Sequence, residues 1–197
     1  MITAIIMASG YSRRMKENKL LLKYKGKPLI QQTIDMVLKC DFSQIILVAR
    51  EKEILQFGKN SGLTVIENKK ADRGISESIK LGVISADECD GYMFFTADQP
   101  LLNVDIINKL LQSFYQDKSH IIVPHYAGRR GSPVIFPEKF KQDLMHLEGD
   151  IGGKIIINKY FEQVRFVEID DEKNLFDVDT QEDYKKILEW DEAEDDF

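Results

Sequence analysis

Short apolar runs that alternate with amphipathic segments constrain the fold of this chain more than any other feature. The runs, each typical of a strand buried on both faces of a sheet, span residues 2–6, 45–48, 63–66, 92–95 and 121–123. The segments predicted to be helices lie between them and span residues 28–39, 51–59, 76–86 and 104–116. Repeated β–α–β units of this kind predict an α/β fold with a doubly wound, mostly parallel sheet of the Rossmann-like type.

The alternation becomes less regular after Pro124. Residues 125–136 are predicted to be a loop that leads into a strand. The elements expected after this loop are an extended segment at 134–136, helices near 138–146 and 151–160, and a strand at 164–169. Thr180 is a good N-cap residue, so a final helix is expected from there to about residue 190.

The composition indicates one folded unit followed by an acidic tail. A chain of 197 residues can bury a substantial core, and no change in composition marks an internal boundary, so a single domain is expected over residues 1–188. Residues 189–197 contain six acidic residues and no basic one, and we expect them to form a frayed C-terminal end. The remaining chain has 27 acidic and 27 basic residues. This neutral balance argues against DNA or RNA as a substrate, since nucleic acids bind basic surfaces.

Two further features predict a cytoplasmic protein with no membrane partner. No apolar run approaches the roughly 20 residues of a membrane-spanning helix, and no basic segment typical of a signal peptide opens the chain. Cys40 and Cys89 lack the spacing of a zinc site or a disulfide framework. They are therefore expected to be reduced thiols.

The loop after the first predicted strand combines small residues with basic ones. The residues expected to face a ligand with their backbone or hydroxyl groups are Met7, Ala8, Ser9, Gly10 and Ser12. Such residues let backbone N–H groups approach an anion, and Arg13, Arg14 and Lys19 add positive charge nearby. The loop has neither the P-loop pattern nor the dinucleotide fingerprint. It predicts a triphosphate-binding loop, although an ordinary turn with exposed arginines fits the spacing equally well.

Acidic residues are expected near the same edge of the sheet. Asp98 directly follows the predicted strand 92–96, where a carboxylate can hold Mg²⁺. Asp98 could instead cap the next helix, but Asn103 is closer to that helix and is itself a good cap. Asp177 and Asp179 would point to the same side of an extended segment, so either could complete the Mg²⁺ site. Acids also favour the start of a helix without any metal.

These clusters, taken in order, resemble the motifs of the MobA-like nucleotidyltransferases, and most closely those of the molybdenum cofactor cytidylyltransferases. Residues 7–21 are similar to the family pattern L-A-A-G-x-S-x-R-M-G-x-x-K-L-L. Five other segments resemble family motifs: G-K-P-L at 26–29, G-I-S-E-S-I at 74–79, D-Q-P at 98–100, G-D-I-G-G-K at 149–154 and D-V-D-T-Q-E-D at 177–183. The resemblance covers about residues 3–184.

Several departures from the family pattern fall close to the expected site. Ser9 replaces a small Ala or Gly, and Lys16 replaces a Gly. Ser132 replaces the His of a G-R-R-G-H-P segment, which leaves the identity of the acceptor open. Lys154 replaces an Arg, so the charge is kept but the bidentate fork is lost.

The resemblance implies a Mg²⁺-dependent enzyme that transfers CMP from CTP to the terminal phosphate of molybdopterin and releases pyrophosphate. The catalytic residues implied are Arg14, Lys19 and Asp98, and the metal ligands are Asp98 and Asp179, with Asp177 as the substitute for Asp179. The nucleotide-binding residues implied are Met7, Ala8, Ser9, Gly10, Ser12, Arg14, Lys19, Ser76 and Ser78. The acceptor-binding residues implied are Arg130, Gly131, Ser132 and Asp150. A molybdenum hydroxylase is the implied docking partner.

Other functions remain open at this stage. GTP could replace CTP as the donor, and a sugar, polyol or terpenoid phosphate could be the acceptor. A protein of a different class, a molybdenum cofactor chaperone without catalytic activity, would also bind molybdopterin. The presence of Lys19, Asp98 and Asp179 argues against the chaperone, because a carrier does not need a metal–triphosphate site.

Overall fold

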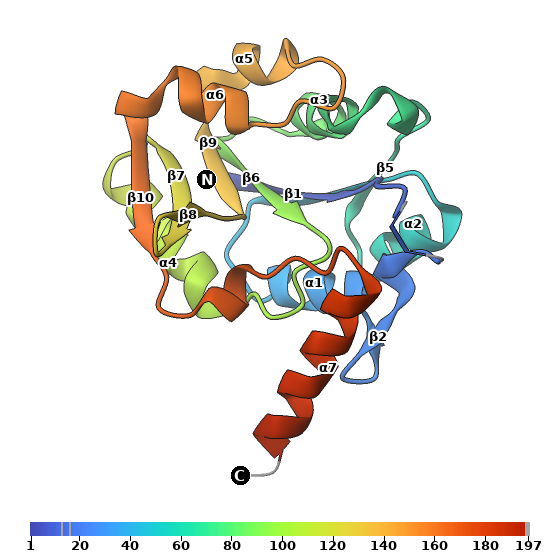
Figure 1. Ribbon diagram of the computed structural model, residues 1–197. Helices are drawn as coiled ribbons and strands as arrows, with labels where there is room; N and C mark the ends of the chain where they lie inside the picture. The colour runs from blue at the N-terminus through green and yellow to red at the C-terminus, as the bar shows by residue number, and fades with distance from the viewer. Residues whose placement is uncertain (13, 16, 196–197) are drawn as a thin grey trace.

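A mixed eight-stranded sheet organises the part of the chain described by the computed structural model, residues 1–12, 14–15 and 17–195 (Figure 1). Arg13 and Lys16, named above, lie outside these residues. The strands of the sheet are β1 (Ile2–Ala8), β4 (Gln44–Ala49), β5 (Thr64–Glu67), β6 (Gly91–Thr96), β7 (Ile121–Tyr126), β8 (Arg129–Arg130), β9 (Val134–Pro137) and β10 (Val164–Glu168). Their order is β10-β7-β9-β6-β1-β4-β5, with β8 paired to β7. Strands β2 (Lys23–Tyr24) and β3 (Lys27–Pro28) form a separate hairpin.

Most pairs of neighbouring strands are parallel, which confirms the predicted fold class. Strand β1 pairs in parallel with β4 and β6, β4 pairs with β5, and β10 pairs with β7. Strand β9 is antiparallel to both β6 and β7. The sheet is therefore a doubly wound, mostly parallel sheet in which the antiparallel strand β9 is inserted near one end and the short β8 pairs antiparallel with β7.

The β7–β8 hairpin corrects the prediction of a loop over residues 125–136. This segment contains the end of β7, the whole of β8 and the start of β9. Ala127 and Gly128 join β7 to β8 with φ angles of 44° and 85°, as a tight two-residue hairpin turn requires. The turn reverses the chain, so β9 enters the sheet antiparallel to its neighbours.

Helices cover both faces of the sheet (Figure 1). One face carries α1 (Leu29–Val37), α2 (Lys52–Asn60) and α4 (Val104–Gln116), whose buried residues share a core with the strands. The other carries α3 (Ile75–Ser85), α5 (Lys141–Met145) and α6 (Lys154–Lys159) around a second core. Short 3-10 helices span Lys19–Leu21, Ala71–Arg73, Glu138–Phe140, Phe161–Gln163 and Glu172–Leu175. No helix among the described residues is long and apolar enough to cross a membrane.

Side-chain caps fix two helix starts as predicted. The Asn103 side chain accepts a hydrogen bond from the Ile106 N–H and caps α4, which leaves Asp98 free of that role. Thr180 and Asp183 cap the final helix reciprocally. The Thr180 hydroxyl accepts from the Asp183 N–H, and the Asp183 carboxylate accepts from the Thr180 N–H.

The final helix, α7 (Gln181–Asp195), is longer than predicted. It contains the first part of the acidic segment, so residues 189–195 are helical rather than frayed. The Trp190 ring packs edge to face on Phe176, with ring centroids 5.1 Å apart. Lys25 Nζ lies 2.6 Å from an Asp191 oxygen. These contacts tie the helix to the body of the protein beyond the expected boundary at residue 188.

Candidate active site at the carboxyl ends of the strands

Two adjoining cavities lie where the loops after β1 and β6 meet the C-terminal segment. The loop cavity, of about 700 Å³, is lined by residues that include Gly10, Lys19 and Asp98. The basic cavity, of about 1020 Å³, is lined by residues that include Arg130 and Lys154. Both cavities share the same five lining residues: Met7, Arg14, Ile75, Thr96 and Asp179. A ligand in one cavity would therefore meet a ligand in the other at Arg14 and Asp179.

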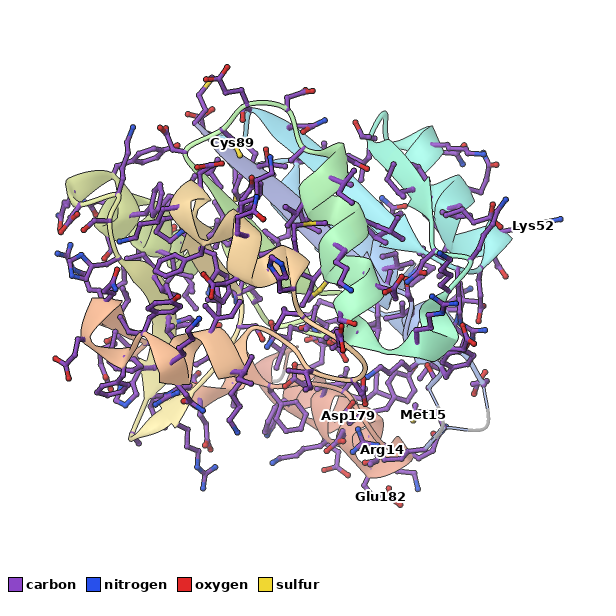
Figure 2. The ribbon with its side chains drawn as sticks, turned by 90° about the horizontal axis from the view of Figure 1, so that it is seen from above. Arg14, Met15, Lys52, Cys89, Asp179 and Glu182 are labelled. Atoms are coloured by element: carbon purple, nitrogen blue, oxygen red, sulfur yellow. The ribbon has the colours of Figure 1, made fainter. Side chains whose placement is uncertain are left out.

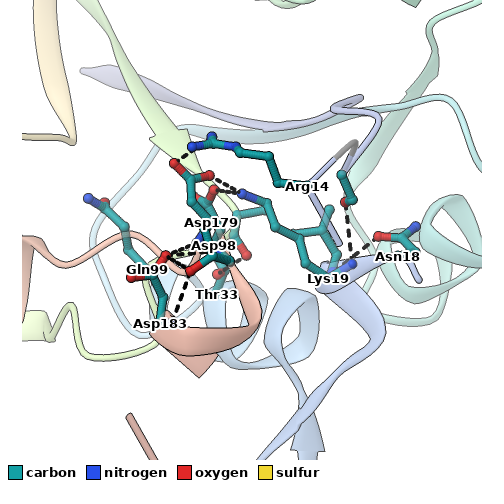
Figure 3. A network of polar contacts seen from close by, with 12 residues as sticks. Arg14, Asn18, Lys19, Thr33, Asp98, Gln99, Asp179 and Asp183 are labelled. Carbon is teal, nitrogen blue, oxygen red and sulfur yellow. Dashed lines mark hydrogen bonds and ion pairs between the residues drawn. The ribbon is translucent and has the colours of Figure 1, made fainter. Parts of the chain in front are cut away.

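An ionic cluster stands at this junction (Figure 3). Lys19 Nζ donates to Asp98 Oδ2 at 2.5 Å and to Asp179 Oδ1 at 2.7 Å. The other carboxylate oxygen of Asp179 lies 2.8 Å from the Arg14 guanidinium, and Figure 2 shows the two side chains from another direction. The Lys19 and Asp98 side chains are only 13% and 14% exposed, whereas Arg14 is 66% exposed. The structure thus brings together the three predicted catalytic residues and the second predicted metal ligand.

The contacts within the cluster shift the pKa values of Lys19 and Asp179 toward their charged forms. Burial tends to lower the pKa of Lys19, but the charge of Asp98 and the hydrogen bonds to both carboxylates outweigh it and raise the pKa. Burial tends to raise the pKa of Asp179, but its contacts with Lys19 and Arg14 outweigh this and lower it. Burial, together with the charges of Asp98 and Asp179, raises the pKa of Asp177 to about 7. The Asp177 carboxyl therefore holds its proton more readily than that of Asp179.

One carboxylate oxygen in the cluster is suited to a cation. Asp98 Oδ1 is buried and accepts no hydrogen bond from any residue that the structure describes. A buried oxygen without a partner costs free energy, which a bound cation would offset. The described residues contain no group of three or more His, Cys, Asp or Glu side chains that could hold a metal ion. A metal at Asp98 and Asp179 would thus need ligands from a substrate, as Mg²⁺ takes from phosphates.

The loop after β1 exposes its backbone to the loop cavity. A Cβ atom added at Gly10 would meet no atom within 4 Å, so this glycine faces open space. The Ser9 hydroxyl is buried and donates to the Val48 carbonyl at 3.3 Å, which shows how the protein accommodates its departure from the family pattern. Ser12 adopts a positive φ of 48°, and its hydroxyl accepts from the Lys19 N–H at 3.3 Å. This hydrogen bond links the turn to the residue that carries the central ammonium group.

The opposite wall of the loop cavity is the start of α3, which rests on the loop at Gly149. The Ser76 N–H donates to the Gly149 carbonyl, and the Ile75 N–H donates to Asp150 Oδ1 at 3.4 Å. The structure therefore places Asp150 in the loop cavity, apart from the other predicted acceptor residues. The reason is this contact with the helix start, which joins segments about 75 residues apart in the chain.

The two predicted serines of α3 have different surroundings. Ser78 lines the loop cavity, and its hydroxyl accepts from Asn68 Nδ2 at 3.1 Å. Ser76 is fully buried and lines neither cavity. Its hydroxyl has no hydrogen-bond partner among the described residues. Of the two side chains, only Ser78 is placed to meet a ligand directly.

Gly74 is required where these two loops meet. Its φ is 99°, and an added Cβ would lie 2.3 Å from the Gly149 backbone. We expect Gly74→Ala to lower the free energy of unfolding by about 3 kcal/mol or more, because strain and overlap with backbone add together. Gly62→Ala is the matched control, since Gly62 has a φ of 74° but open space around it, and it should cost about 1 kcal/mol. Urea unfolding measures both values, and equal losses would contradict the role of the contact.

Three of the predicted acceptor residues line the basic cavity. They are Arg130, from the end of β8, and Gly131 and Ser132, from the segment that links β8 to β9. Arg130 donates to Asn158 Oδ1 at 2.7 Å, which orients its guanidinium. The same cavity is also lined by C-terminal residues that the sequence reasoning missed, among them Phe176, Lys186 and Trp190. Trp190, the one tryptophan of the chain, was the available signal, but it lay in a segment expected to fray.

Comparison of the sequence with known protein families assigns the chain to one of them. The family model described as the MobA-like NTP transferase domain matches residues 4–164. The chain belongs to the MobA-like NTP transferase family. It is 26% identical over 191 residues to a probable molybdenum cofactor guanylyltransferase of Thermococcus sibiricus, a match that covers 93% of this chain and 95% of the relative. It is 27% identical over 192 residues to the molybdenum cofactor cytidylyltransferase of Escherichia coli, with 93% of each chain covered.

A solved structure extends the likeness to three dimensions. The crystal structure of Rv0371c from Mycobacterium tuberculosis superposes with a TM-score of 0.84 at 25% identity, over 95% of this chain and 97% of that one. This MobA-like NTP transferase is therefore a nucleotidyltransferase with the nucleotide-diphospho-sugar transferase fold. The guanylyl and cytidylyl relatives are about equally similar to it, so family membership alone does not fix the nucleotide.

Proposed function

We propose that this MobA-like NTP transferase transfers CMP from CTP to the terminal phosphate of molybdopterin and releases pyrophosphate. The observation that carries the proposal is the meeting of the two cavities at Arg14 and Asp179. A triphosphate in the loop cavity and a phosphate acceptor in the basic cavity would face each other across the ionic cluster. The likeness to the cytidylyltransferase of E. coli supports the choice of donor and acceptor. GTP is the second candidate donor, supported by the likeness to the guanylyltransferase of T. sibiricus.

In this mechanism the loop after β1 holds the donor. The backbone N–H groups around Ala8, Ser9 and Gly10, with the Ser12 hydroxyl, bind the β- and γ-phosphates. Lys19 and Arg14 neutralise the charge that develops on the α-phosphate and on the leaving pyrophosphate. Such charge neutralisation matters more than acid–base chemistry here, because the two reacting groups are both anions.

Asp98 and Asp179 are the residues that would hold Mg²⁺, which supplies charge neutralisation between donor and acceptor phosphates. The buried Asp98 Oδ1 without a hydrogen-bond partner fits this role. Lys19 must then release at least part of its contact with these carboxylates, and the triphosphate offers its ammonium group new anionic partners. We propose that Lys19 moves from the carboxylates toward the phosphates when the substrate binds.

The acceptor phosphate attacks without a general base. One of its oxygens, already ionised near neutral pH, forms a bond to the α-phosphorus, and the bond from that phosphorus to the bridging oxygen of the β-phosphate breaks. The electron pair leaves with pyrophosphate, and no proton needs to be removed from the nucleophile. Rate enhancement then comes from holding the two phosphates in line and from neutralising their charge.

A panel of nucleoside triphosphates tests the proposal. The protein is incubated with Mg²⁺, molybdopterin and CTP, GTP, ATP or UTP, and pyrophosphate release is measured. We expect CTP to give the highest kcat/KM. Faster release with GTP would make the protein a guanylyltransferase, and tight molybdopterin binding without pyrophosphate release from any nucleotide would make it a carrier. Faster turnover with a sugar, polyol or terpenoid phosphate than with molybdopterin would contradict molybdopterin as the acceptor.

A further inference from the structure

The basic cavity has an apolar floor and a cationic rim. Its floor is the surface of the sheet, where Phe94 of β6 and Phe136 of β9 pack with ring centroids 5.9 Å apart. Arg130 and Lys154 are among the cationic residues that line the cavity. A cavity of this kind suits a ligand that is partly planar and apolar and partly anionic.

The cations of this rim are available for an anion. Arg129, Arg130, Lys154 and Lys186 line the cavity, and none forms an ion pair with a carboxylate of the described residues. At the junction, by contrast, Arg14 is paired with Asp179. Glu172, Asp177 and Asp183 add carboxylates to the lining, and Asp183 is engaged in the cap of α7. Unpaired cations around one cavity repel each other, so an anionic ligand relieves that repulsion.

Helix α7 contributes one wall of the cavity through a single face. Asp183, Lys186 and Trp190 recur at intervals of three and four residues, so they share this face, and all three line the cavity. Ile187 lies next to this face and is fully buried in a cluster with Leu29, and Trp190 packs against the same cluster. Ile187 is the fully buried anchor of α7, and Trp190 contributes both to this anchoring and to the lining of the cavity.

Three of the side chains from the C-terminal segment form an aromatic and cationic group. Lys186 Nζ lies 5.0 Å from the centroid of the Phe176 ring and 4.8 Å from that of the Trp190 ring. Lys173 Nζ also lies 5.1 Å from the Trp190 ring. Contacts between an exposed lysine and a ring are weak, so a ligand ring can replace them.

We propose that Phe176, Lys186 and Trp190 form the part of the basic cavity that binds the planar heteroaromatic ring of the phosphorylated acceptor. The ring packs on Trp190, Lys186 contacts an anionic or carbonyl group of the ligand, and the phosphate points toward Arg14. Stacking on an aromatic side chain is tolerant of the identity of the ring. This inference rests on the proposed function, which places a phosphate acceptor in this cavity.

The fluorescence of Trp190 offers a direct test, because the chain contains one tryptophan. The full-length protein, without nucleotide, is titrated with molybdopterin, and separately with glycerol 3-phosphate and inorganic phosphate as ligands that lack the ring. We expect saturable quenching by molybdopterin and none by the other two at the same concentrations. Binding of molybdopterin detected by calorimetry without a change in Trp190 fluorescence would overturn the inference.

Variants separate ring binding from a purely structural role. Trp190→Leu should raise the KM for molybdopterin about tenfold and leave the KM for CTP unchanged, whereas Trp190→Phe should keep a KM near that of the wild type. Lys186→Ala should raise the Kd for molybdopterin about fivefold. Lys185→Ala is the matched control, since Lys185 is exposed and lines neither cavity. Equal effects of the two lysine variants would contradict the role of Lys186.

The readouts also distinguish this inference from the proposed function. Quenching by molybdopterin without transfer from any nucleotide would contradict the proposed reaction but support ring binding by Phe176, Lys186 and Trp190. If Trp190→Leu transfers the nucleotide to molybdopterin with an unchanged KM for molybdopterin, the proposed reaction is supported and the role of Trp190 in ring binding is contradicted. Circular dichroism melting of each variant shows whether it is folded.

Discussion

Replacing Asp98 by asparagine is expected to reduce Mg²⁺-dependent nucleotidyl transfer by about three orders of magnitude. Asparagine keeps the shape of the side chain and can still accept the hydrogen bond from Lys19 Nζ, so the fold should persist. It removes the negative charge, and with it the ability of the buried Oδ1 to hold a divalent cation. Pyrophosphate release under saturating CTP and molybdopterin measures the loss.

The matched control for this change is Asp105→Asn, in the first turn of α4. Asp105 is exposed and lines neither cavity, so the variant should turn over at the wild-type rate. Paramagnetic resonance of Mn²⁺ in the presence of CTP gives a second readout, and Asp98→Asn should weaken Mn²⁺ binding. Turnover near that of the wild type in Asp98→Asn would exclude Asp98 as a metal ligand.

Replacing Lys19 by alanine should have two effects of opposite sign. It should lower kcat about 100-fold and raise the KM for CTP, because a cation directed at the phosphates is lost. It should also strengthen the binding of Mn²⁺ to the protein without nucleotide, because Asp98 and Asp179 lose the ammonium group that lies between them. A Lys19 with only a structural role would give neither effect in a folded variant.

Lys27→Ala is the control for the Lys19 variant. It also breaks a lysine–aspartate pair, in which Lys27 Nζ lies 2.5 Å from Asp35 Oδ2, but Lys27 is exposed and lines neither cavity. Both kcat and Mn²⁺ binding should stay at wild-type values in this variant. If Lys19→Ala binds Mn²⁺ no better than Lys27→Ala does, the lysine does not compete with the metal.

The regular part of the fold could be predicted because each buried parallel strand corresponds to a continuous apolar run in the sequence. Each predicted strand and helix has an observed counterpart whose ends lie within three residues of the predicted ones, except at the end of α7. The predicted position of Asp98 at a strand end follows from the same reasoning, since the strand before it is an apolar run that ends at Thr96.

The remaining features depend on contacts between distant residues. Strand β8 has two residues and exists because Ala127 takes a positive φ, for which its sequence gives no signal. The cluster joins Lys19 to Asp179, 160 residues away. The cavity-lining face of α7 could not be predicted from the acidic composition of the last residues. Composition averages over the whole segment, whereas the face consists of only every third or fourth residue.

The position of Lys19 between Asp98 and Asp179 also implies thermodynamic linkage between two ligands. If a triphosphate draws the ammonium group away and thereby increases the affinity for the divalent cation, the cation must increase the affinity for the triphosphate by the same factor. A single mobile positive charge then makes binding of either ligand alone weak and binding of both together strong. The free enzyme would therefore bind divalent cations weakly between turnovers and bind them together with the nucleotide.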